Sequence, residues 1–204
     1  MTSVRDVTLV DMGLGNLRSV ARAFERAGAS VTITGDAAEV ARASCVVVPG
    51  QGAFRDGARA LSGDLGVALR EAIQRDVPYF GICLGMQLLF DRSDESPGDA
   101  GLSVFSGEVR RIPHVPGLKV PHMGWNEVTS SHPLLSDSSY FYFVHSYHCV
   151  PTDASLVAST VNYGGALCAA IARGKMFACQ FHPEKSQDAG AHLIERFLSG
   201  AAWN

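Results

Sequence analysis

Short apolar segments alternate with helical patterns through the first half of the chain. The segments that favour strands are Val7–Asp11, Val31–Thr34, Cys45–Val48 and Pro78–Cys83. The segments that show the helical period or follow a capping residue are Asn16–Ala27, Asp36–Ser44, Asp64–Gln74 and Leu84–Phe90. Unbroken apolar strands are buried on both faces, and strands that alternate with helices form a parallel sheet. We therefore predict an α/β fold with a mostly parallel central sheet and helices on both faces.

The second half of the chain is richer in strand-like segments than in helices. The expected strands are Val104–Ile112, Tyr140–Val150, Leu156–Val161, Leu167–Ala172 and Met176–Phe181. A final amphipathic helix is expected over Ala189–Leu198, and the acidic, glycine-containing segment Asp91–Gly101 is expected to be a surface loop. We expect the later strands to add antiparallel pairs to the sheet. Because 204 residues suit one full core, we predict a single domain over residues 1–204.

Charge and cysteine content exclude several classes of protein. With 17 basic and 20 acidic residues, the net charge of −3 argues against binding nucleic acid through a basic surface. The longest mostly apolar stretch, Tyr79–Phe90, is shorter than the roughly 20 residues that span a bilayer, and no signal peptide is visible. The five cysteines are odd in number and form no CxxC motif, which argues against a disulfide framework or a cysteine zinc site. We expect a protein of the reducing cytoplasm without membrane contact.

A glycine-flanked cysteine stands where an apolar strand is expected to meet a helix. The sequence GICLG at 81–85 has the G-x-nucleophile-x-G pattern of a nucleophile elbow, with Cys83 at its centre. The flanking glycines let strand and helix approach, so we expect the Cys83 side chain to be exposed at the end of the sheet. There the helix N-terminus favours the thiolate, and the N–H of Leu84 can stabilise an oxyanion. Taken alone, the segment fits a buried structural cysteine equally well.

A histidine and a glutamate two residues apart can serve a thiol nucleophile as base and orienting group. His182 and Glu184 flank Pro183 directly after the last expected strand, at the edge where a parallel sheet places its active site. The residue before a proline is extended, and side chains two apart in an extended segment point the same way. We therefore predict that both face one site, with Glu184 holding the imidazole. Alone, the segment is more typical of a solvated turn; beside an elbow cysteine it indicates a catalytic triad.

Two further segments can complete such a site. Gly50 and Gln51 follow a buried strand, and the glycines at 50 and 52 allow a peptide to turn its N–H towards Cys83 as a second oxyanion donor. Gln87 lies one helical turn after Cys83, so its amide can reach the same cleft and hold a polar substrate. The plainer alternatives are an ordinary loop at 50–52 and a glutamine that only caps the core.

Two other patterns are weaker, and we expect neither a cofactor nor a metal. The Gly-Leu-Gly sequence at 13–15 lies between a strand and a helix, but Arg18 stands where a dinucleotide fingerprint needs its third glycine. A tight turn or a partner contact explains it better. His145 and His148 are three apart on one expected strand, so their side chains would face opposite sides and could not share a metal.

The motifs together resemble the class I, or triad, glutamine amidotransferases. The match runs along nearly the whole chain, through PGQGAF at 49–54, GICLGMQ at 81–87 and FHPEKS at 181–186. The resemblance implies that Cys83 attacks the side-chain amide of glutamine, that His182 delivers a proton to departing ammonia, and that water hydrolyses the glutamate thioester. It also implies that the oxyanion is surrounded by Gly50, Gln51 and Leu84. The positions that match the family's glutamine-binding residues are Gly52, Gln87, Ser146 and Tyr147.

Three more segments resemble one branch of this family, the glutaminase subunits of imidazole glycerol phosphate synthases. They are DMGLGN at 11–16, VPHMGWN at 120–126 and FVHSY at 143–147. The positions that match this branch at or near its contact with the synthase are Asn16, Trp125 and Lys185. The residues that depart from those usual in the family are Met12, Gln51 and His148, none of which belongs to the triad.

A glutaminase that only released ammonia would be wasteful, and 204 residues leave no room for a domain that binds an acceptor. We therefore expect the synthase to be a separate chain. The resemblance implies a heterodimer with a (β/α)8-barrel cyclase, which uses the ammonia to make imidazole glycerol phosphate and aminoimidazole carboxamide ribotide in histidine biosynthesis. Three alternatives stay open: an amidotransferase for anthranilate or pyridoxal phosphate synthesis, a cysteine hydrolase on a similar fold, and a non-catalytic binding subunit.

Overall fold

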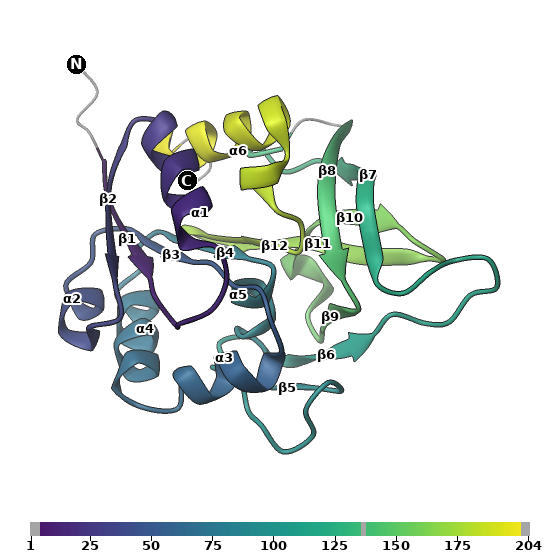
Figure 1. The fold of residues 1–204 in the computed structure, drawn as a ribbon, viewed down its shortest axis with the longest axis horizontal. Helices are drawn as coiled ribbons and strands as arrows, with labels where there is room; N and C mark the ends of the chain where they lie inside the picture. The colour runs from purple at the N-terminus through teal and green to yellow at the C-terminus, as the bar shows by residue number, and fades with distance from the viewer. Residues whose placement is uncertain (1–4, 136–137, 201–204) are drawn as a thin grey trace.

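A nine-stranded sheet runs through the middle of the molecule (Figure 1). The computed structural model describes residues 5–135 and 138–200. The strands of this sheet are β1 Arg5–Val10, β2 Ala29–Thr34, β3 Val46–Val48, β4 Tyr79–Ile82, β7 His122–Ser130, β8 Ser138–His145, β10 Val157–Asn162, β11 Ala166–Arg173 and β12 Met176–Cys179. Their order across the sheet is β2-β1-β3-β4-β12-β11-β10-β7-β8.

The sheet changes from parallel to antiparallel at β12. Strands β2, β1, β3, β4 and β12 pair in parallel. From β12 onwards, each neighbouring pair through β11, β10, β7 and β8 is antiparallel. The predicted α/β fold with added antiparallel strands is confirmed. The carboxyl ends of β4 and β12, which are neighbours, therefore lie at the same edge, where a parallel sheet places a site.

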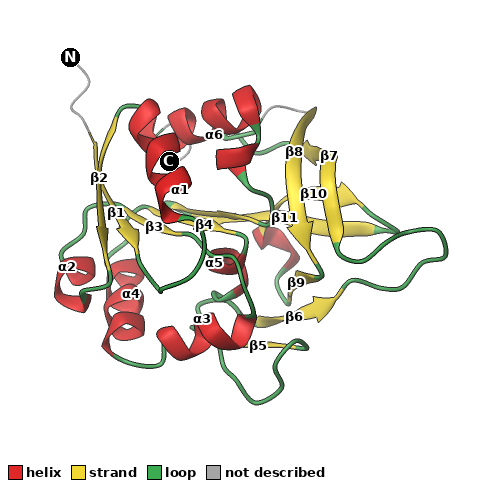
Figure 2. Ribbon diagram, in the orientation of Figure 1, coloured by secondary structure: helices red, strands yellow, loops and turns green. Residues whose placement is uncertain are grey.

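Helices cover both faces of the parallel part of the sheet (Figure 2). They are α1 Leu17–Arg26, α2 Ala37–Ala41, α3 Phe54–Ala60, α4 Asp64–Gln74, α5 Leu84–Gln87 and α6 Gln187–Ser199. On one face, α1 and α6 bury Phe24 and Leu193; on the other, α2 to α5 bury Phe54 and Leu69. Two such apolar layers account for strands that are apolar on both sides. In residues 5–135 and 138–200, no helix has the length and apolar character needed to span a bilayer.

The sequence prediction missed or merged several elements. No helix was expected over α3, which follows directly after the predicted oxyanion segment at 50–52, and β7 was not expected at all. The single strand expected over Tyr140–Val150 is two strands, because the chain turns at Ser146 between β8 and β9 Tyr147–Pro151. Strand β9 leaves the large sheet and joins β6 Gly107–Arg111 and β5 Arg92–Ser93 in a small second sheet, in the order β5-β6-β9. This turn brings Ser146 and Tyr147 over the edge of the sheet that carries Cys83.

The glycine at position 85 is required for the close approach of α5 to β3. A Cβ placed on Gly85 would lie 1.9 Å from the carbonyl oxygen of Val48, which is backbone and cannot move aside. We expect Gly85→Ala to lower the free energy of unfolding by about 3 kcal/mol or more in urea denaturation. Gly63→Ala is the matched control, because no atom lies within 4 Å of its Cβ position. Equal stability of the two variants would contradict this packing.

Candidate active site

Cys83 lies between the end of β4 and the start of α5, on a strained turn. Its backbone has φ 51° and ψ −102°, a conformation that side chains other than glycine rarely adopt. A hydrogen bond ties the turn to the sheet, because the N–H of Cys83 donates to the carbonyl of Cys179 on β12 at 2.7 Å. Gly81 also permits it, since a Cβ there would lie 2.9 Å from both Ala178 Cβ and the Gly85 carbonyl oxygen. The geometry is that of a nucleophile elbow.

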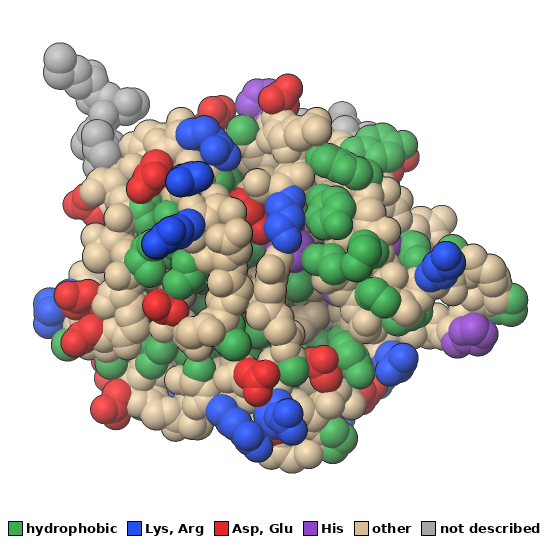
Figure 3. Space-filling model, viewed as in Figure 1, with side chains coloured by type: hydrophobic (Ala, Val, Ile, Leu, Met, Phe, Trp, Pro, Cys, Tyr) green, Lys and Arg blue, Asp and Glu red, His purple; other side chains and the backbone are tan. Residues whose placement is uncertain are grey.

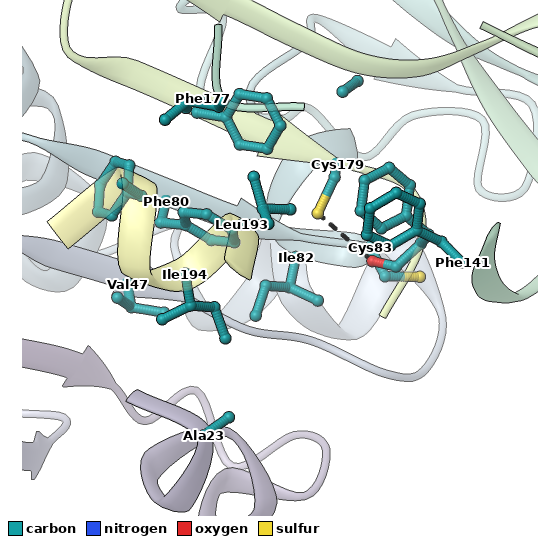
Figure 4. Close-up of a cluster of buried hydrophobic side chains, with 14 of the residues drawn as sticks. Ala23, Val47, Phe80, Ile82, Cys83, Phe141, Phe177, Cys179, Leu193 and Ile194 are labelled. Atoms are coloured by element: carbon teal, nitrogen blue, oxygen red, sulfur yellow. Dashed lines mark hydrogen bonds between the residues drawn. The ribbon is translucent and has the colours of Figure 1, made fainter. Parts of the chain in front are cut away.

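The thiol of Cys83 is more buried than expected. The residue is 8% exposed and belongs to the apolar cluster that α1 and α6 cover. Cys83 and Phe80 lie at opposite ends of the part of this cluster drawn in Figure 4. It nevertheless lines a cavity of about 450 Å³ that opens beside the turn. The expectation of a freely exposed side chain was wrong, because the β8–β9 turn covers the edge of the sheet. The sulfur is reached through the cavity rather than from open solvent.

His182 follows β12, the strand next to β4. The backbone after β12 is tied to β8: the N–H of His182 donates to the Tyr142 carbonyl at 2.9 Å. The Ser186 hydroxyl donates to the His182 carbonyl at 2.6 Å and accepts from the N–H of Tyr142 at 3.0 Å. The imidazole itself is only 1% exposed. The hydrogen bonds fix the backbone at His182, and burial confines the ring.

Glu184 bonds to His182, although not through an extended segment. Nδ1 of His182 lies 2.8 Å from Oε1 of Glu184, and both side chains are buried. His182 has the extended backbone expected before a proline, but Pro183–Lys185 forms a short 3-10 turn. The expectation of a continuous extended segment was wrong for this turn. The turn, rather than strand alternation, brings the carboxylate back beside the ring.

The surroundings of His182 favour its charged form. Burial lowers the pKa of this imidazole, but its interactions with the Cys83 thiol and the Glu184 carboxylate outweigh burial and raise the pKa to about 9. Nδ1 is used by Glu184, whereas Nε2 is buried without a hydrogen-bond partner among the described residues. Nε2 is therefore the nitrogen left to exchange a proton with the sulfur or with a substrate.

Replacement of Glu184 by glutamine is expected to change the pH profile of glutamine hydrolysis. The substitution removes one of the interactions that raise the pKa of His182, so this pKa falls from about 9 towards its ordinary value. A step that needs the imidazolium as proton donor is lost as pH rises through that pKa. We therefore expect the alkaline limb of kcat/KM to move to lower pH by about one unit. Glu195→Gln, on the exposed face of α6, is the control; an alkaline limb unmoved by Glu184→Gln would contradict this role.

The expected oxyanion donors are arranged differently from the prediction. The N–H of Leu84 donates to the carbonyl of Gly50 at 3.4 Å. The Leu84 N–H, which an oxyanion would need as a donor, is therefore already bonded to the Gly50 carbonyl. The peptide between Gly50 and Gln51 points its oxygen, and not its N–H, towards Leu84. Gly50 is packed so closely that a Cβ there would lie 2.7 Å from Leu84 Cβ. Gly52 has φ 132°, and Gln51 and Gly52 line the cavity.

The residues expected to hold glutamine meet around this cavity. Those that line it are Gly52, Gln87, Ser146 and Tyr147. The amide nitrogen of Gln87 is used within the protein, because it donates to the Tyr147 carbonyl and to Oε1 of Gln180, each at 3.1 Å. Two residues of the site were missed by sequence reasoning. Glu95 comes from the expected surface loop and lines the cavity. Gln180 lies next to Cys83, with Nε2 3.3 Å from Sγ.

Of the residues expected at a partner contact, Lys185 lines the cavity, and the Trp125 ring lies 6.2 Å from that of Tyr142, which also lines it. Trp125 is 46% exposed on β7. Lys185 is exposed and lines the cavity, with Nζ 5.9 Å from the centre of the Tyr142 ring. Asn16 is exposed at the start of α1, where its side chain accepts from the N–H of Ser19. Their place on the surface leaves all three available to another chain.

Histidines near the cavity form a structural pair. His122 Nδ1 lies 3.0 Å from His145 Nε2, and His145 Nδ1 lies 2.9 Å from the Tyr147 carbonyl. Burial lowers the pKa of His122 to about 4 and that of His145 to about 3, so both rings are neutral at pH 7. His145 and His148 do not lie on one strand, as had been expected, because the strand is broken between them at Ser146.

Comparison with known proteins identifies the class. The family model for glutamine amidotransferase class-I matches residues 8–201. One solved glutamine amidotransferase superimposes with a TM-score of 0.75 at 20% identity, over 95% of this chain and 98% of that one. PurLQS from Thermotoga maritima gives a TM-score of 0.75 at 16% identity, over 97% and 99%. These likenesses show a shared fold, and the family match shows that the chain belongs to the class I glutamine amidotransferases.

Within that class, the chain matches one kind of subunit along nearly its whole length. It is 44% identical to the imidazole glycerol phosphate synthase subunit HisH of Moorella thermoacetica, over 95% of this chain and 94% of that one. It is 46% identical to the HisH subunit of Aromatoleum aromaticum, over 96% and 99%. The chain is therefore a member of the HisH family.

Proposed function

We propose that this chain is the glutaminase subunit of an imidazole glycerol phosphate synthase. It hydrolyses glutamine to glutamate and ammonia, and a separate cyclase chain uses the ammonia. The observation that carries the proposal is the juxtaposition of Cys83, His182 and Glu184 beside a cavity of about 450 Å³. The near full-length similarity to HisH subunits supports the choice of synthase.

In the proposed reaction, the Cys83 sulfur attacks the carboxamide carbon of glutamine. The proton from the thiol passes to His182 Nε2 and then to the leaving nitrogen, so that ammonia departs and a glutamyl thioester remains. His182 next takes a proton from water, the hydroxide attacks the thioester, and the thiol and glutamate are released. Glu184 keeps Nδ1 engaged and stabilises the imidazolium in both steps. No cofactor or metal enters this sequence.

The tetrahedral intermediates need donors that the resting site does not present. The N–H of Leu84 is bonded to the Gly50 carbonyl. Rotation of the peptide between Gly50 and Gln51 would free that N–H and turn the N–H of Gln51 towards the same place, which gives two oxyanion donors. We infer that the isolated subunit rests with this peptide turned the wrong way, and that the partner controls the rotation.

The proposed partner site is the exposed side of β7 and β8. Met123, Trp125 and Tyr140 are 63%, 46% and 57% exposed, and hydrophobic side chains gather over these strands (Figure 3). The register pairs Met123 with Val144 and Trp125 with Tyr142, and both partners line the cavity. This apolar surface is therefore continuous with the cavity wall. We propose that a (β/α)8-barrel cyclase docks here and receives ammonia through the interface, which keeps the ammonia from becoming ammonium in bulk water.

A glutaminase assay tests the proposal. We expect the isolated chain to hydrolyse glutamine slowly, and the rate to rise at least tenfold when the cyclase and its nucleotide substrate are both added, because the peptide between Gly50 and Gln51 then turns. The measurement is glutamate release under each condition. An isolated subunit as active as the complex would overturn the proposal that the partner controls this peptide rotation.

The alternative synthases give different outcomes. Copurification from a lysate with an anthranilate or a pyridoxal phosphate synthase, in place of the cyclase, would reassign the subunit. Peptide cleavage without glutaminase activity would instead indicate a cysteine hydrolase. The buried cysteines are all free thiols, which agrees with our proposal that the protein works in the cytoplasm.

A further inference from the structure

Gln180 is a fully buried amide next to the nucleophile. It is 0% exposed and lies one residue beyond β12, whose Cys179 pairs with Ile82 in the parallel register. Continued by one residue, that register places Gln180 beside Cys83. Its own backbone N–H donates to the Ala169 carbonyl of β11 at 2.8 Å, so the residue is held from both sides. A buried polar side chain needs hydrogen-bond partners, and those of Gln180 are informative.

The hydrogen bonds determine which way the Gln180 amide points. The Tyr147 carbonyl can only accept, so the atom of Gln87 that lies 3.1 Å from it is the amide nitrogen. The same nitrogen lies 3.1 Å from Gln180, which must therefore present its oxygen, Oε1, to it. This leaves Nε2 of Gln180 to face Cys83, at 3.3 Å from Sγ. The Tyr147 carbonyl thus fixes the orientation of both side-chain amides, and the oxygen and nitrogen of Gln180 cannot be exchanged.

We propose that Gln180 is a positioning residue that holds the Cys83 sulfur and stabilises its thiolate. An N–H donor interacts more strongly with a thiolate than with a thiol, so it favours ionisation. Nε2 of Gln180 lies 3.3 Å from the sulfur, and the His182 imidazole interacts with the same thiol, so both side chains meet at Cys83 Sγ. The inference rests on the proposed role of Cys83 as the nucleophile and adds a second group that prepares it.

The proposal also connects the nucleophile with the substrate cavity. Gln87 lines the cavity and holds the Gln180 oxygen, and Gln180 in turn holds the sulfur. A change at Gln87 therefore loosens the amide that faces Cys83. We expect the effects of Gln87→Met and Gln180→Met on thiolate formation to be less than additive in the double variant.

The test measures the pH dependence of Cys83 alkylation by iodoacetamide in the full chain. All five cysteines are buried, but Cys83 lines the cavity and burial raises the pKa of the other four, so Cys83 is the thiol that iodoacetamide reaches. Mass spectrometry counts the adducts, and Cys83→Ala is the blank. Gln180→Met removes both hydrogen bonds at nearly constant volume, and Gln74→Met, on the exposed side of α4, is the matched control.

We expect Gln180→Met to move the midpoint of alkylation to higher pH by about one unit, which is about tenfold less thiolate below the midpoint. Gln74→Met should leave it in place. A midpoint shared by the wild type and Gln180→Met would overturn the proposal, because a residue that only fills space does not change ionisation. If glutamine is hydrolysed but the midpoint does not move, this inference alone fails. If the midpoint moves but glutamine is not hydrolysed, the proposed function fails instead.

A second measurement does not depend on the variant folding. In the wild-type chain, the side-chain amide resonance of Gln180 should shift with pH at the midpoint found for Cys83 alkylation. The same resonance should not titrate in Cys83→Ala. An amide signal that is insensitive to pH in the wild type would contradict a hydrogen bond from Gln180 to the sulfur.

Discussion

Replacement of Cys83 by alanine is expected to reduce glutamine-dependent synthesis by about 10⁴-fold or more, which is the scale on which loss of a nucleophile acts. No other described thiol can substitute, because those at 45, 149, 168 and 179 are buried away from the cavity and burial raises the pKa of each. The measurement is formation of imidazole glycerol phosphate by the reconstituted complex with glutamine as nitrogen source.

The control for Cys83→Ala is synthesis with added ammonium salt, which needs only the cyclase. We expect this rate to be unchanged and the two chains still to copurify, since Cys83 lies at the edge of the core and not on the exposed side of β7 and β8. Removal of the sulfur also leaves the Gln180 N–H without its acceptor, so stability should fall by about 1–3 kcal/mol. Glutamine-supported turnover in this variant would eliminate the assigned nucleophile.

His182→Ala is expected to lower glutamine hydrolysis by about 10⁴-fold as well. The imidazole is the only group with a buried nitrogen left unpaired next to Cys83 and a carboxylate on its other side, among the residues that the structure describes. Without it, neither the departure of ammonia nor the attack of water has a proton carrier. The measurement is single-turnover release of ammonia and glutamate from glutamine.

His192→Ala, on the exposed side of α6, is the control for a general effect of losing a histidine and should keep full activity. Loss of His182 also leaves Glu184 buried without its cationic partner, so circular dichroism and thermal unfolding have to accompany the assay. A folded His182→Ala variant that hydrolyses glutamine within about tenfold of the wild type would remove His182 from the proposed mechanism.

Local sequence patterns were sufficient for most of the fold. Apolar runs of strand length predicted β3 and β4, and the helix over Asp64–Gln74 was predicted with its observed bounds. Asp36 was predicted to cap a helix, and its side chain accepts hydrogen bonds at the start of α2. Asn16 caps α1 in the same way, although it was not predicted as a cap. These features depend on neighbours a few residues away, which is why one sequence reveals them.

Elements defined by distant contacts were not predicted. Strand β7 alternates exposed and covered residues, but its covered positions include His122, Gly124 and Asn126, so the sequence shows no apolar alternation. Its place next to β8 and β10 depends on partners elsewhere in the chain. The break between β8 and β9 has no glycine or proline at Ser146 to signal it. Glu95 has the sequence context of a surface loop, and its carboxylate reaches the site because it accepts the N–H of Phe54 at the start of α3.

The sequence alone determined the fold class, the elbow at Cys83 and the pairing of His182 with Glu184, because each is encoded by residue types at short, fixed spacings. Which groups surround the sulfur depends instead on how distant segments pack together. The parallel register of β12 against β4 puts Gln180 beside Cys83, and the packing of Gly50 against Leu84 turns a carbonyl to the N–H that an oxyanion would need. Registers and peptide orientations of this kind depend on contacts between segments about 30 to 100 residues apart, since a shift of one residue turns a side chain to the other face.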